Sequence, residues 1–350
     1  STPVAMAAGI GSGGRRGVLI KGGIHLENLG RIRVLAVDKT GTLTLGRPAV
    51  TDVVPLDGGS PGQILAVAGA VERMSEHPLA RAIVEAADAK GAPVLPSHGF
   101  EALTGAGARV ELDGRTAYVG SPDLFAELGG TVPAQAIEAA DQLRTQGKTV
   151  VLVGQHSSDA SEPPAIIGLI AIRDQIRPNA RAAIDALHRL GVRRIVMLSG
   201  DHPHTAAAIA AELGIDDVRA GLRPQDKVTA IRELESKYGE VAMVGDGVND
   251  APALAQATVG IAMGTAGTDA AIEAADVALM GDDLEQAAFA LRLGRKARSV
   301  SRQNVAFSLV LLAVLIPGAA IGLFTIAIAV TVHEVAELLA VGNGLRVWRA

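Results

Sequence analysis

The 350-residue sequence contains no cysteine, so no disulfide, thiolate metal site or cysteine nucleophile can form within it. Aromatic residues make up only 2% of the chain, which argues against the base-stacking platforms that bind single-stranded nucleic acids. The formal net charge of −5 is mild and gives no basic footprint for a phosphate backbone. These scarcities together argue against nucleic acid as a partner.

What the chain has in excess is apolar sequence. Apolar residues reach 49% and the mean hydropathy is +0.31, which is high for a soluble protein of two or three domains. Most of the chain reads as ordinary α/β sequence, and the excess is concentrated in the last fifty residues. The first residues, Ser1-Thr2-Pro3-Val4, are neither an initiator methionine nor a signal peptide, so we expect a fragment of a longer protein.

The apolar excess predicts a membrane hairpin. No charge and no histidine occurs over residues 303–332, whereas one spanning helix needs only about 20 residues. Apolar sequence then resumes as far as Leu345, and Pro317-Gly318 and Gly322 are candidates for the turn, although a proline kink inside a helix is an alternative. Basic residues flank both ends, which favours two crossings with both ends on the cytoplasmic side. They are Arg292, Arg295, Lys296, Arg298 and Arg302 before the run and Arg346 and Arg349 after it. A pair of buried core helices is the competing interpretation.

Three ionisable residues interrupt the second half of this apolar region. His333 and Glu337 are four residues apart and share a helix face, while Glu334 lies about 100° round the helix from His333. Ionisable groups at membrane depth usually face a bundle interior and mark an ion path. If the segment instead emerges at a headgroup interface, these groups are merely hydrated.

The stretch VLAVDKTGTLT, residues 34–44, reads as a buried parallel strand that ends at a loop. Asp38 falls at the carboxyl end of that strand, where open α/β sheets place their ligand chemistry. A carboxylate there can attack a phosphoryl group and form an aspartyl phosphate. The backbone and hydroxyl groups of Thr40, Gly41 and Thr42 would cradle the phosphate oxygens.

Two further apolar runs end in polar turns. RRIVMLSGD ends at Ser199-Gly200-Asp201, and EVAMVGDGVNDAPAL carries Asp246, Asn249 and Asp250. Lys227 lies between them, in RPQDKVTAI. A nucleophilic aspartate, a hydroxyl residue, a lysine and a late acidic pair are the parts that phosphoryl transfer needs, with Mg²⁺ on carboxylates and the lysine against the phosphate. Each string alone is an ordinary turn, whereas all of them in this order favour catalysis.

The strings DKTGTLT (residues 38–44) and GDGVNDAP (residues 245–252) resemble the phosphorylation and hinge signatures of P-type ATPases. The resemblance implies an α/β fold: a Rossmann-like phosphorylation (P) domain of haloacid-dehalogenase type, interrupted by an α+β nucleotide-binding (N) domain and followed by a transmembrane hairpin. It implies that ATP phosphorylates Asp38 and that Mg²⁺ is held by Asp38, the Thr40 carbonyl and Asp246. Ser199-Gly200-Asp201 corresponds to the family's Thr-Gly-Asp. The residues that the resemblance assigns to catalysis and phosphate binding are Asp38, Thr40, Thr42, Ser199, Gly200, Asp201, Lys227, Asp246, Asn249 and Asp250.

Position 40 separates two enzymatic interpretations. Phosphatases of this superfamily usually carry a second aspartate two residues after the nucleophile, and Thr40 stands there instead. Without a carboxylate to activate water, an aspartyl phosphate should live longer, which suits a pump that holds its phosphoenzyme while it changes shape.

Residues 48–164 are the expected N domain. The segment ERMSEHPLARAI has a periodic apolar face with His77-Pro78 near a helix start, and a Gly-x-Gly precedes strand-like alternation. Taken alone, Gly-x-Gly is most often a β-turn. Ser-Glu-His-Pro followed by Gly-x-Gly resembles the heavy-metal-transporting (P1B) branch, where these residues hold adenine and the phosphate chain. The resemblance therefore assigns nucleotide contacts to Glu76, His77, Gly105 and Gly107.

Residues 1–30 resemble the segment that follows the intramembrane Cys-Pro-Cys-type motif of the same pumps. The resemblance implies a membrane-helix end and cytoplasmic stalk at 1–24, a P domain at 25–47 and 165–297, and two transmembrane helices at 298–350. The Cys-Pro-x motif, the earlier membrane helices and the actuator domain would precede Ser1, so the chain would be the C-terminal half of such a pump.

The last two helices supply cargo ligands in this family. The pair His333-Glu334 resembles the cobalt-type branch, although the usual glycines are replaced, and the zinc/cadmium-type lysine is absent between Asn304 and Leu323. Imidazole and carboxylates suit divalent ions such as Zn²⁺, Cd²⁺, Co²⁺ or Ni²⁺ and are poor ligands for Cu⁺. We therefore expect the cargo at His333 and Glu334, with Glu337 as a weaker candidate.

The expected function is ATP-driven efflux of a divalent heavy-metal cation, with ATP and Mg²⁺ as cofactors. The chain would lie in the bilayer of the cytoplasmic membrane, with its catalytic domains in the cytoplasm. The alternatives are a soluble phosphatase or phosphotransferase of the haloacid-dehalogenase superfamily, and a membrane sensor that has lost turnover.

Overall fold

The computed structural model describes residues 2–56, 58–103, 105–156, 163–201, 203–246, 250–264, 273–281, 283–323 and 325–349. The chain divides into two compact units. The first comprises Ser1–Leu43, Arg177–Gly200 and Ala210–Ala350, and the second comprises Thr44–Ile176 and Asp201–Ile209. The second unit extends beyond the expected range of 48–164 at both ends, because the two strands that border it belong to its sheet throughout.

Over the described residues, the first unit contains a seven-stranded sheet in the order β1-β13-β12-β11-β2-β9-β10. Its strands are β1 (Val18–Ile20), β2 (Val34–Asp38), β9 (Arg194–Leu198), β10 (Asp217–Arg219), β11 (Val241–Gly245), β12 (Val259–Met263) and β13 (Val277–Leu279). β2 pairs in parallel with β11 on one side and with β9 on the other. All residues of β2 and β11 are buried, as expected for strands covered on both faces. The three strands predicted to end in polar turns are therefore neighbours, which confirms the Rossmann-like prediction.

Helices cover this sheet and extend from it. They are α1 (Thr2–Arg15), α2 (Gly23–Leu29), α7 (Ala180–Arg189), α9 (Pro224–Tyr238), α10 (Ala251–Gln256), α12 (Glu285–Ala320) and α13 (Ile326–Leu345), while α8 (Pro203–Leu213) begins in the second unit and ends in the first. α9 and α10 pack Ile231, Leu234 and Leu254 against β2, β9 and β11 in one buried apolar cluster. α2 and α7 lie against α12.

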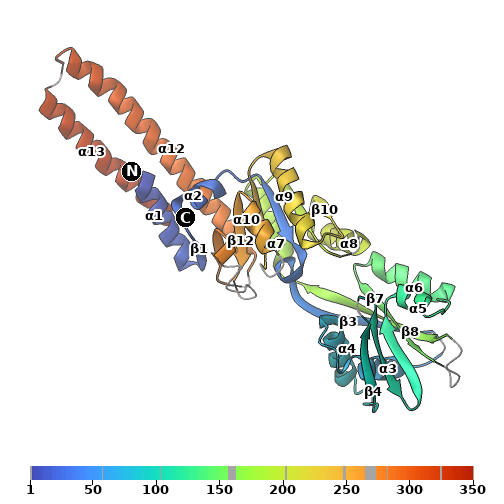
Figure 1. Ribbon diagram of the computed structural model, residues 1–350. Helices are drawn as coiled ribbons and strands as arrows, with labels where there is room; N and C mark the ends of the chain where they lie inside the picture. The colour runs from blue at the N-terminus through green and yellow to red at the C-terminus, as the bar shows by residue number, and fades with distance from the viewer. Residues whose placement is uncertain are drawn as a thin grey trace. The chain divides into compact units, whose positions relative to one another are not determined.

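α12 and α13 form a long hairpin, with α1 beside its base (Figure 1). α12 continues through Pro317 and Gly318, so these residues do not form the turn, whereas Gly322, at a φ of 74° that favours glycine, lies in it. Both α12 and the segment Ile326–Arg349 are long and apolar enough to cross a membrane. Large apolar side chains such as Leu309, Ile316 and Leu338 are exposed along them, which a soluble core pair would not show. The prediction of two apolar C-terminal helices is confirmed.

The described part of the second unit is built on a six-stranded antiparallel sheet in the order β3-β8-β7-β6-β5-β4. Its strands are β3 (Thr44–Pro55), β4 (His98–Leu103), β5 (Gly107–Leu112), β6 (Arg115–Gly120), β7 (Thr149–Gln155) and β8 (Ala165–Ile176). Helices α3 (Pro61–Glu72) and α4 (Pro78–Ala89) pack on one face, and α5 (Pro122–Glu127) and α6 (Ala134–Thr145) on the other (Figure 1). Side chains along β6 point alternately to the two faces of the sheet: Val119 belongs to the core under α3 and α4, and Tyr118 to the core under α5 and α6.

Candidate functional site

Asp38 is the last residue of β2, the strand between β11 and β9. Ser199 directly follows β9 and Asp246 directly follows β11. Because the three strands are parallel and in register, their carboxyl ends meet at one edge of the sheet. The structure thus brings Asp38, Ser199 and Asp246 to a common edge.

Lys227, on α9, joins this edge from the helix layer. Its Nζ lies 2.6 Å from Asp38 Oδ1 and 2.6 Å from Asp250 Oδ1. All three side chains are buried, with residue exposures of 7% for Lys227, 5% for Asp38 and 1% for Asp250. One lysine therefore bridges two carboxylates away from bulk water, where such interactions are strong and unpaired charge is costly.

The protonation of this cluster follows from its burial. Burial raises the pKa of Asp38 to about 7, the charge of Asp250 adds to the rise, and Lys227 opposes it. Burial lowers the pKa of Lys227, but the charges of Asp38 and Asp250 outweigh that effect and raise it above its ordinary value. The lysine is thus a stable cation shared by two carboxylates, while burial and the neighbouring carboxylates favour the neutral form of Asp38, and a further cation would favour its ionised form.

The turn after Asp38, η1 (Lys39–Leu43), is clamped by a residue far along the chain. Arg177, only 3% exposed, donates from Nε to the Thr42 carbonyl at 2.9 Å and from Nη2 to the Gly41 carbonyl at 2.8 Å. Gly41 has a φ of 73°, which an L side chain disfavours. The clamp and the glycine together fix the loop that follows the candidate nucleophile.

Two buried polar atoms beside this loop lack partners. Thr42 Oγ1 and Asp250 Oδ2 make no hydrogen bond to any residue that the structure describes. A Cβ built on Gly41 would lie 2.8 Å from Asp246 Oδ2, so that carboxylate stands directly against η1. Carboxylates of Asp38 and Asp246 beside a loop of backbone carbonyls match the hard oxygen donors that Mg²⁺ prefers. The residues present therefore fit Mg²⁺ and a phosphoryl group.

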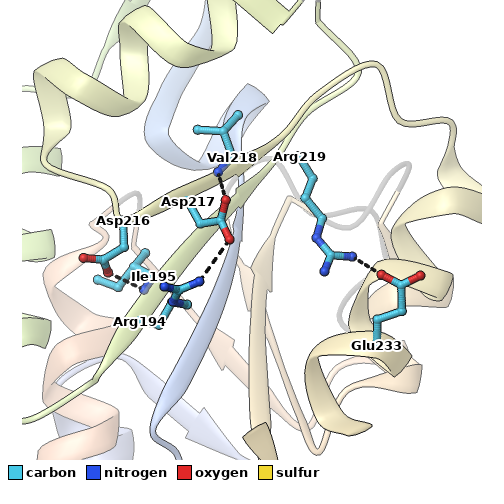
Figure 2. A network of polar contacts seen from close by, with 7 residues as sticks. All are labelled: Arg194, Ile195, Asp216, Asp217, Val218, Arg219 and Glu233. Atoms are coloured by element: carbon cyan, nitrogen blue, oxygen red, sulfur yellow. Dashed lines mark hydrogen bonds and ion pairs between the residues drawn. The ribbon is translucent and has the colours of Figure 1, made fainter. Parts of the chain in front are cut away.

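A polar network surrounds the edge strand β10, next to β9 (Figure 2). Asp216 accepts from the Ile195 backbone N–H at 2.7 Å, and Arg219 donates to Glu233 of α9 at 2.6 Å. Ser199 in turn donates its backbone N–H to the Arg219 carbonyl at 2.9 Å. The edge strand thus ties Ser199 to α9, the helix that carries Lys227.

Four further predicted residues have different outcomes. Gly200 follows Ser199 in the first unit, whereas Asp201 is grouped with the second unit, just before α8. Thr40 is exposed in η1, with an extended backbone. Asn249 lies outside the described residues.

The second unit holds a separate cavity of about 470 Å³, with mostly apolar walls from α3, α4, β5, β6 and β7. Its polar groups include Glu72 and His77, and its floor includes Gly105 and Gly107. An apolar slot with a few polar groups is the usual form of a small-molecule site. The predicted His77, Gly105 and Gly107 are thus brought together, whereas Glu76 is exposed and does not line this cavity.

Each of these residues has a local structural reason for its place. His77 caps α4, its Nδ1 accepting from the Leu79 N–H at 3.2 Å, so that a neutral ring carries its proton on Nε2. Gly105 has a φ of 76° in the turn before β5. A Cβ on Gly107 would lie 2.1 Å from the Val119 carbonyl oxygen, so only glycine allows β5 to approach β6 this closely.

Glu72 is the carboxylate inside this cavity. It ends α3 and is 9% exposed. Burial raises its pKa to about 7, and a hydrogen bond from Ser75 lowers it only in part. A buried acceptor on an apolar wall can select a ligand that offers a hydrogen-bond donor.

The ionisable residues of α13 do not form a closed metal site. His333, Glu334 and Glu337 are all exposed, and no group of three or more metal-ligating side chains gathers within the described ranges. The buried residues of α13 are Ala336, Ala340 and Gly344. At about 100° per residue His333 falls in the arc of this small-residue stripe, Glu337 falls at its edge, and Glu334 points elsewhere.

Comparison with known proteins agrees with this arrangement. Residues 32–258 match the model of the haloacid dehalogenase-like hydrolase family. A manganese-exporting P-type ATPase of Mycobacterium tuberculosis (strain ATCC 25618 / H37Rv) is 44% identical over 350 residues, which is 100% of this chain and 48% of the relative. A probable cadmium-transporting ATPase of Listeria monocytogenes is 42% identical, over 100% of this chain and 49% of the relative. The chain therefore spans about half the length of the curated relatives it matches.

A solved structure matches at the level of the fold and the sequence. The crystal structure of a zinc-transporting PIB-type ATPase in its E2.Pi state superimposes with a TM-score of 0.82 at 39% identity. The match covers 99% of this chain and 55% of the solved one.

Two residues of these sites, Glu72 and Arg177, were not predicted from the sequence. Glu72 had a usable signal, since it lies four residues after Ala68 and seven after Leu65, both fully buried, and so falls on the buried face of α3. Arg177 had none, because the Thr42 carbonyl that it holds lies 135 residues earlier in the chain.

Proposed function

We propose that this chain, which belongs to the haloacid dehalogenase-like hydrolase family and within it to the PIB-type P-type ATPases, is the catalytic part of an ATP-driven exporter of divalent metal cations. The observation that carries the proposal is the buried cluster in which Lys227 bridges Asp38 and Asp250 at the end of the central strand. Phosphoryl transfer belongs to the first unit and nucleotide binding to the second.

Asp38 is the nucleophile in this proposal. A carboxylate oxygen of Asp38 attacks the γ-phosphorus of ATP, the bond to the β,γ-bridging oxygen breaks, and ADP leaves with that electron pair. Lys227, 2.6 Å from Asp38 Oδ1, neutralises charge on the transferred group. The Thr42 hydroxyl, which has no hydrogen-bond partner among the described residues, and the backbone of η1 are donors for its oxygens.

Mg²⁺ would be held by Asp38, Asp246 and the Thr40 carbonyl. When bound, it neutralises phosphate charge and favours the ionised carboxylates around it. The raised pKa of Asp38, to which the charges of Asp250 and Asp246 contribute, and the position of Asp246 against Gly41 support this assignment. Asp250 keeps Lys227 in place rather than touching the nucleotide.

Thr40 supports the pump over the phosphatase alternative. It offers no carboxylate to activate a water molecule against the aspartyl phosphate. Hydrolysis of the intermediate then requires a group from outside the described site, which suits a cycle in which the phosphoenzyme must persist.

The cavity of the second unit receives the adenosine of ATP. The apolar walls cover the adenine ring, and Glu72 accepts a hydrogen bond from its exocyclic amine. His77 Nε2 remains a donor because Nδ1 already caps α4. Glu72 therefore takes the place first assigned to Glu76.

The cargo is a divalent cation that the relatives' names narrow to manganese, zinc or cadmium. Manganese was not among the ions expected from the ligand chemistry. His333 and Glu334 are the proposed ligands, with Glu337 secondary. Because these side chains are exposed, the remaining ligands come from a segment that packs over this part of α13.

We place the chain in the cytoplasmic membrane, with α12 and α13 in the bilayer and the sheet of the first unit and the whole second unit in the cytoplasm. The two apolar helices and the basic residues at their cytoplasmic ends support this orientation. In this orientation ATP and the cation both bind from the cytoplasm, so the proposed direction of transport is out of the cytoplasm.

The test uses the chain joined to the additional region that its relatives carry, reconstituted in vesicles. With γ-labelled ATP and one divalent ion at a time, we expect an acid-stable, hydroxylamine-labile phosphoenzyme that appears with Zn²⁺, Cd²⁺ or Mn²⁺. It should vanish in Asp38→Asn and persist in Asp185→Asn, a matched change on the surface of α7. Rapid phosphate release without metal and without a phosphoenzyme would favour the phosphatase.

The cargo ligands need their own variants. His333→Ala and Glu334→Ala should each abolish metal-stimulated ATP hydrolysis while nucleotide affinity stays unchanged. Full metal stimulation of ATP hydrolysis in both variants would show that these residues bind no cargo and are hydrated at the headgroup interface instead.

A further inference from the structure

A cavity of about 480 Å³ lies in the first unit where α2 meets α12, at the point where α12 turns from charged to apolar. Arg31, Arg298, Ser301 and Arg302 form its polar end. Val305 and Leu309 continue its wall along the apolar part of α12, and both are exposed. The wall thus changes from cationic to apolar along one direction, as an amphiphilic ligand would require.

The polar end of this cavity has more positively charged side chains than carboxylates to pair with them. Three guanidinium groups and the single carboxylate of Glu27 leave a net charge of +2 on the wall. Arg31 is paired with Glu27 at 2.5 Å, and Arg298 donates to the Gly30 carbonyl at 3.3 Å. Arg302 makes no ion pair or hydrogen bond with any part of the chain that the structure describes.

Two buried polar atoms at this end also lack partners. Ser301 is 8% exposed, and its Oγ has no hydrogen-bond partner among the described residues. Arg31 Nε is likewise buried and unpartnered there, although the Nη2 atom of the same residue is engaged. Buried donors normally find acceptors, so this wall lacks a group that supplies them.

The cavity borders a tight contact that leads to the catalytic strand. A Cβ on Gly30 would lie 2.7 Å from the Gly294 carbonyl oxygen, so the end of α2 sits directly against α12. Arg31 follows this contact, and β2 begins three residues later at Val34. A ligand held by Arg31 and Arg302 would therefore brace the junction between the membrane helix and the strand that carries Asp38.

We propose that this cavity binds an anionic phospholipid, with its phosphate between Arg31 and Arg302 and an acyl chain along Val305 and Leu309. Guanidinium groups bind phosphate oxygens through paired N–H donors, and basic pockets on the cytoplasmic side of membrane helices select anionic headgroups. A free phosphate ion would satisfy only the polar end. The inference rests on the membrane placement proposed above.

The experiment uses the complete chain in nanodiscs of phosphatidylcholine with increasing phosphatidylglycerol. Retained lipid is counted by native mass spectrometry. We expect one phosphatidylglycerol retained per chain, and about tenfold weaker retention in Arg31→Gln/Arg302→Gln. Arg292→Gln removes an exposed charge from the same helix outside this cavity and should change retention by less than twofold. Arg302→Lys should be intermediate, because it keeps the charge but not the paired donors.

Further measurements distinguish a bound phospholipid from a free phosphate ion, and a wrong lipid site from a wrong membrane placement. Leu309→Ser should weaken lipid retention, whereas competition by millimolar inorganic phosphate would identify an ion site and overturn the lipid assignment. Equal retention by the double variant and the unaltered chain, both with native circular dichroism, would overturn the site. A chain that does not float with vesicles would overturn the membrane placement and this inference together, whereas a chain that floats without lipid preference overturns the inference alone.

Discussion

Asp38 in the first unit and Glu72 in the second are both buried carboxylates whose pKa rises to about 7, but their surroundings differ. Asp38 shares a lysine with a second carboxylate, and three charges hold one another in place. Glu72 stands on a mostly apolar wall, and no ion pair joins it to another described residue. The first arrangement suits a nucleophile that works with a cation, and the second suits recognition of a neutral donor.

The largest expected effect comes from removing the shared lysine. Lys227→Met leaves Asp38 and Asp250 buried without a counter-charge, so the free energy of unfolding of the first unit should fall by about 3–5 kcal/mol. Denaturant titration with hydrogen exchange on peptides from β2 and α9 measures it. Lys227→Arg is the control that keeps the charge, and a loss below about 1 kcal/mol in Lys227→Met would show that the three charges are not coupled.

The second unit should respond to backbone contacts rather than to charge. Gly107→Ala forces β5 away from β6, because its Cβ would lie 2.1 Å from a carbonyl oxygen. We expect a loss of about 1–3 kcal/mol and weaker binding of a non-hydrolysable ATP analogue. Gly105→Ala meets no atom within 4 Å and strains only the turn, so it should cost about 1 kcal/mol. Equal effects of the two changes would contradict the role given to the close strand contact.

Glu72 makes the stability of the second unit depend on pH. Because its folded-state pKa of about 7 lies above its ordinary value of 4.5, the folded unit binds more protons between these values. Its stability should therefore fall as pH rises from 4.5 to 7 and stay level above that range, a decrease of up to about 3 kcal/mol. Glu72→Gln should remove this slope, as followed by hydrogen exchange on α3. An unchanged slope would mean that another group titrates.

The smallest expected effect separates the two roles of His77. His77→Ala should cost about 1 kcal/mol by removing the cap of α4, and His77→Asn should retain that stability. Both changes should weaken nucleotide binding several-fold in calorimetry, because neither keeps the Nε2 donor. Full affinity in His77→Asn would reduce His77 to a capping residue.

The sequence predicts best those elements in which an apolar run ends directly at polar residues of the site. β2, β9 and β11 are continuous apolar runs that end in polar turns, so both their existence and the position of Asp38 follow from local sequence. The hairpin follows from length and hydropathy, but the sequence leaves the place of its turn open between Pro317-Gly318 and Gly322. Pro317 is accommodated inside α12, and Gly322 forms the turn because it can adopt a positive φ.

What local sequence does not reveal is burial produced by distant packing. The spacing of Leu65, Ala68 and Glu72 puts them on one face of α3, but the cavity that Glu72 lines forms only where α3 packs on the sheet, and Glu76 stays outside it. The Arg177 clamp depends on two segments that meet only in the folded first unit. Nor does the sequence show that Lys227 contacts both Asp38 and Asp250, since the distance between their atoms is set by the register of α9 against β2.

Identification of the phosphorylated residue tests the central claim most directly. The chain, joined to the region that its relatives carry, is incubated with ATP, Mg²⁺ and a stimulating divalent ion, quenched in acid and reduced with borohydride. Reduction converts an aspartyl phosphate to homoserine, which peptide mass spectrometry locates. The proposed mechanism predicts homoserine at position 38 and nowhere else, in amounts that fall to background in Lys227→Met. Homoserine at another aspartate, or none while ATP is hydrolysed at full rate, would contradict it.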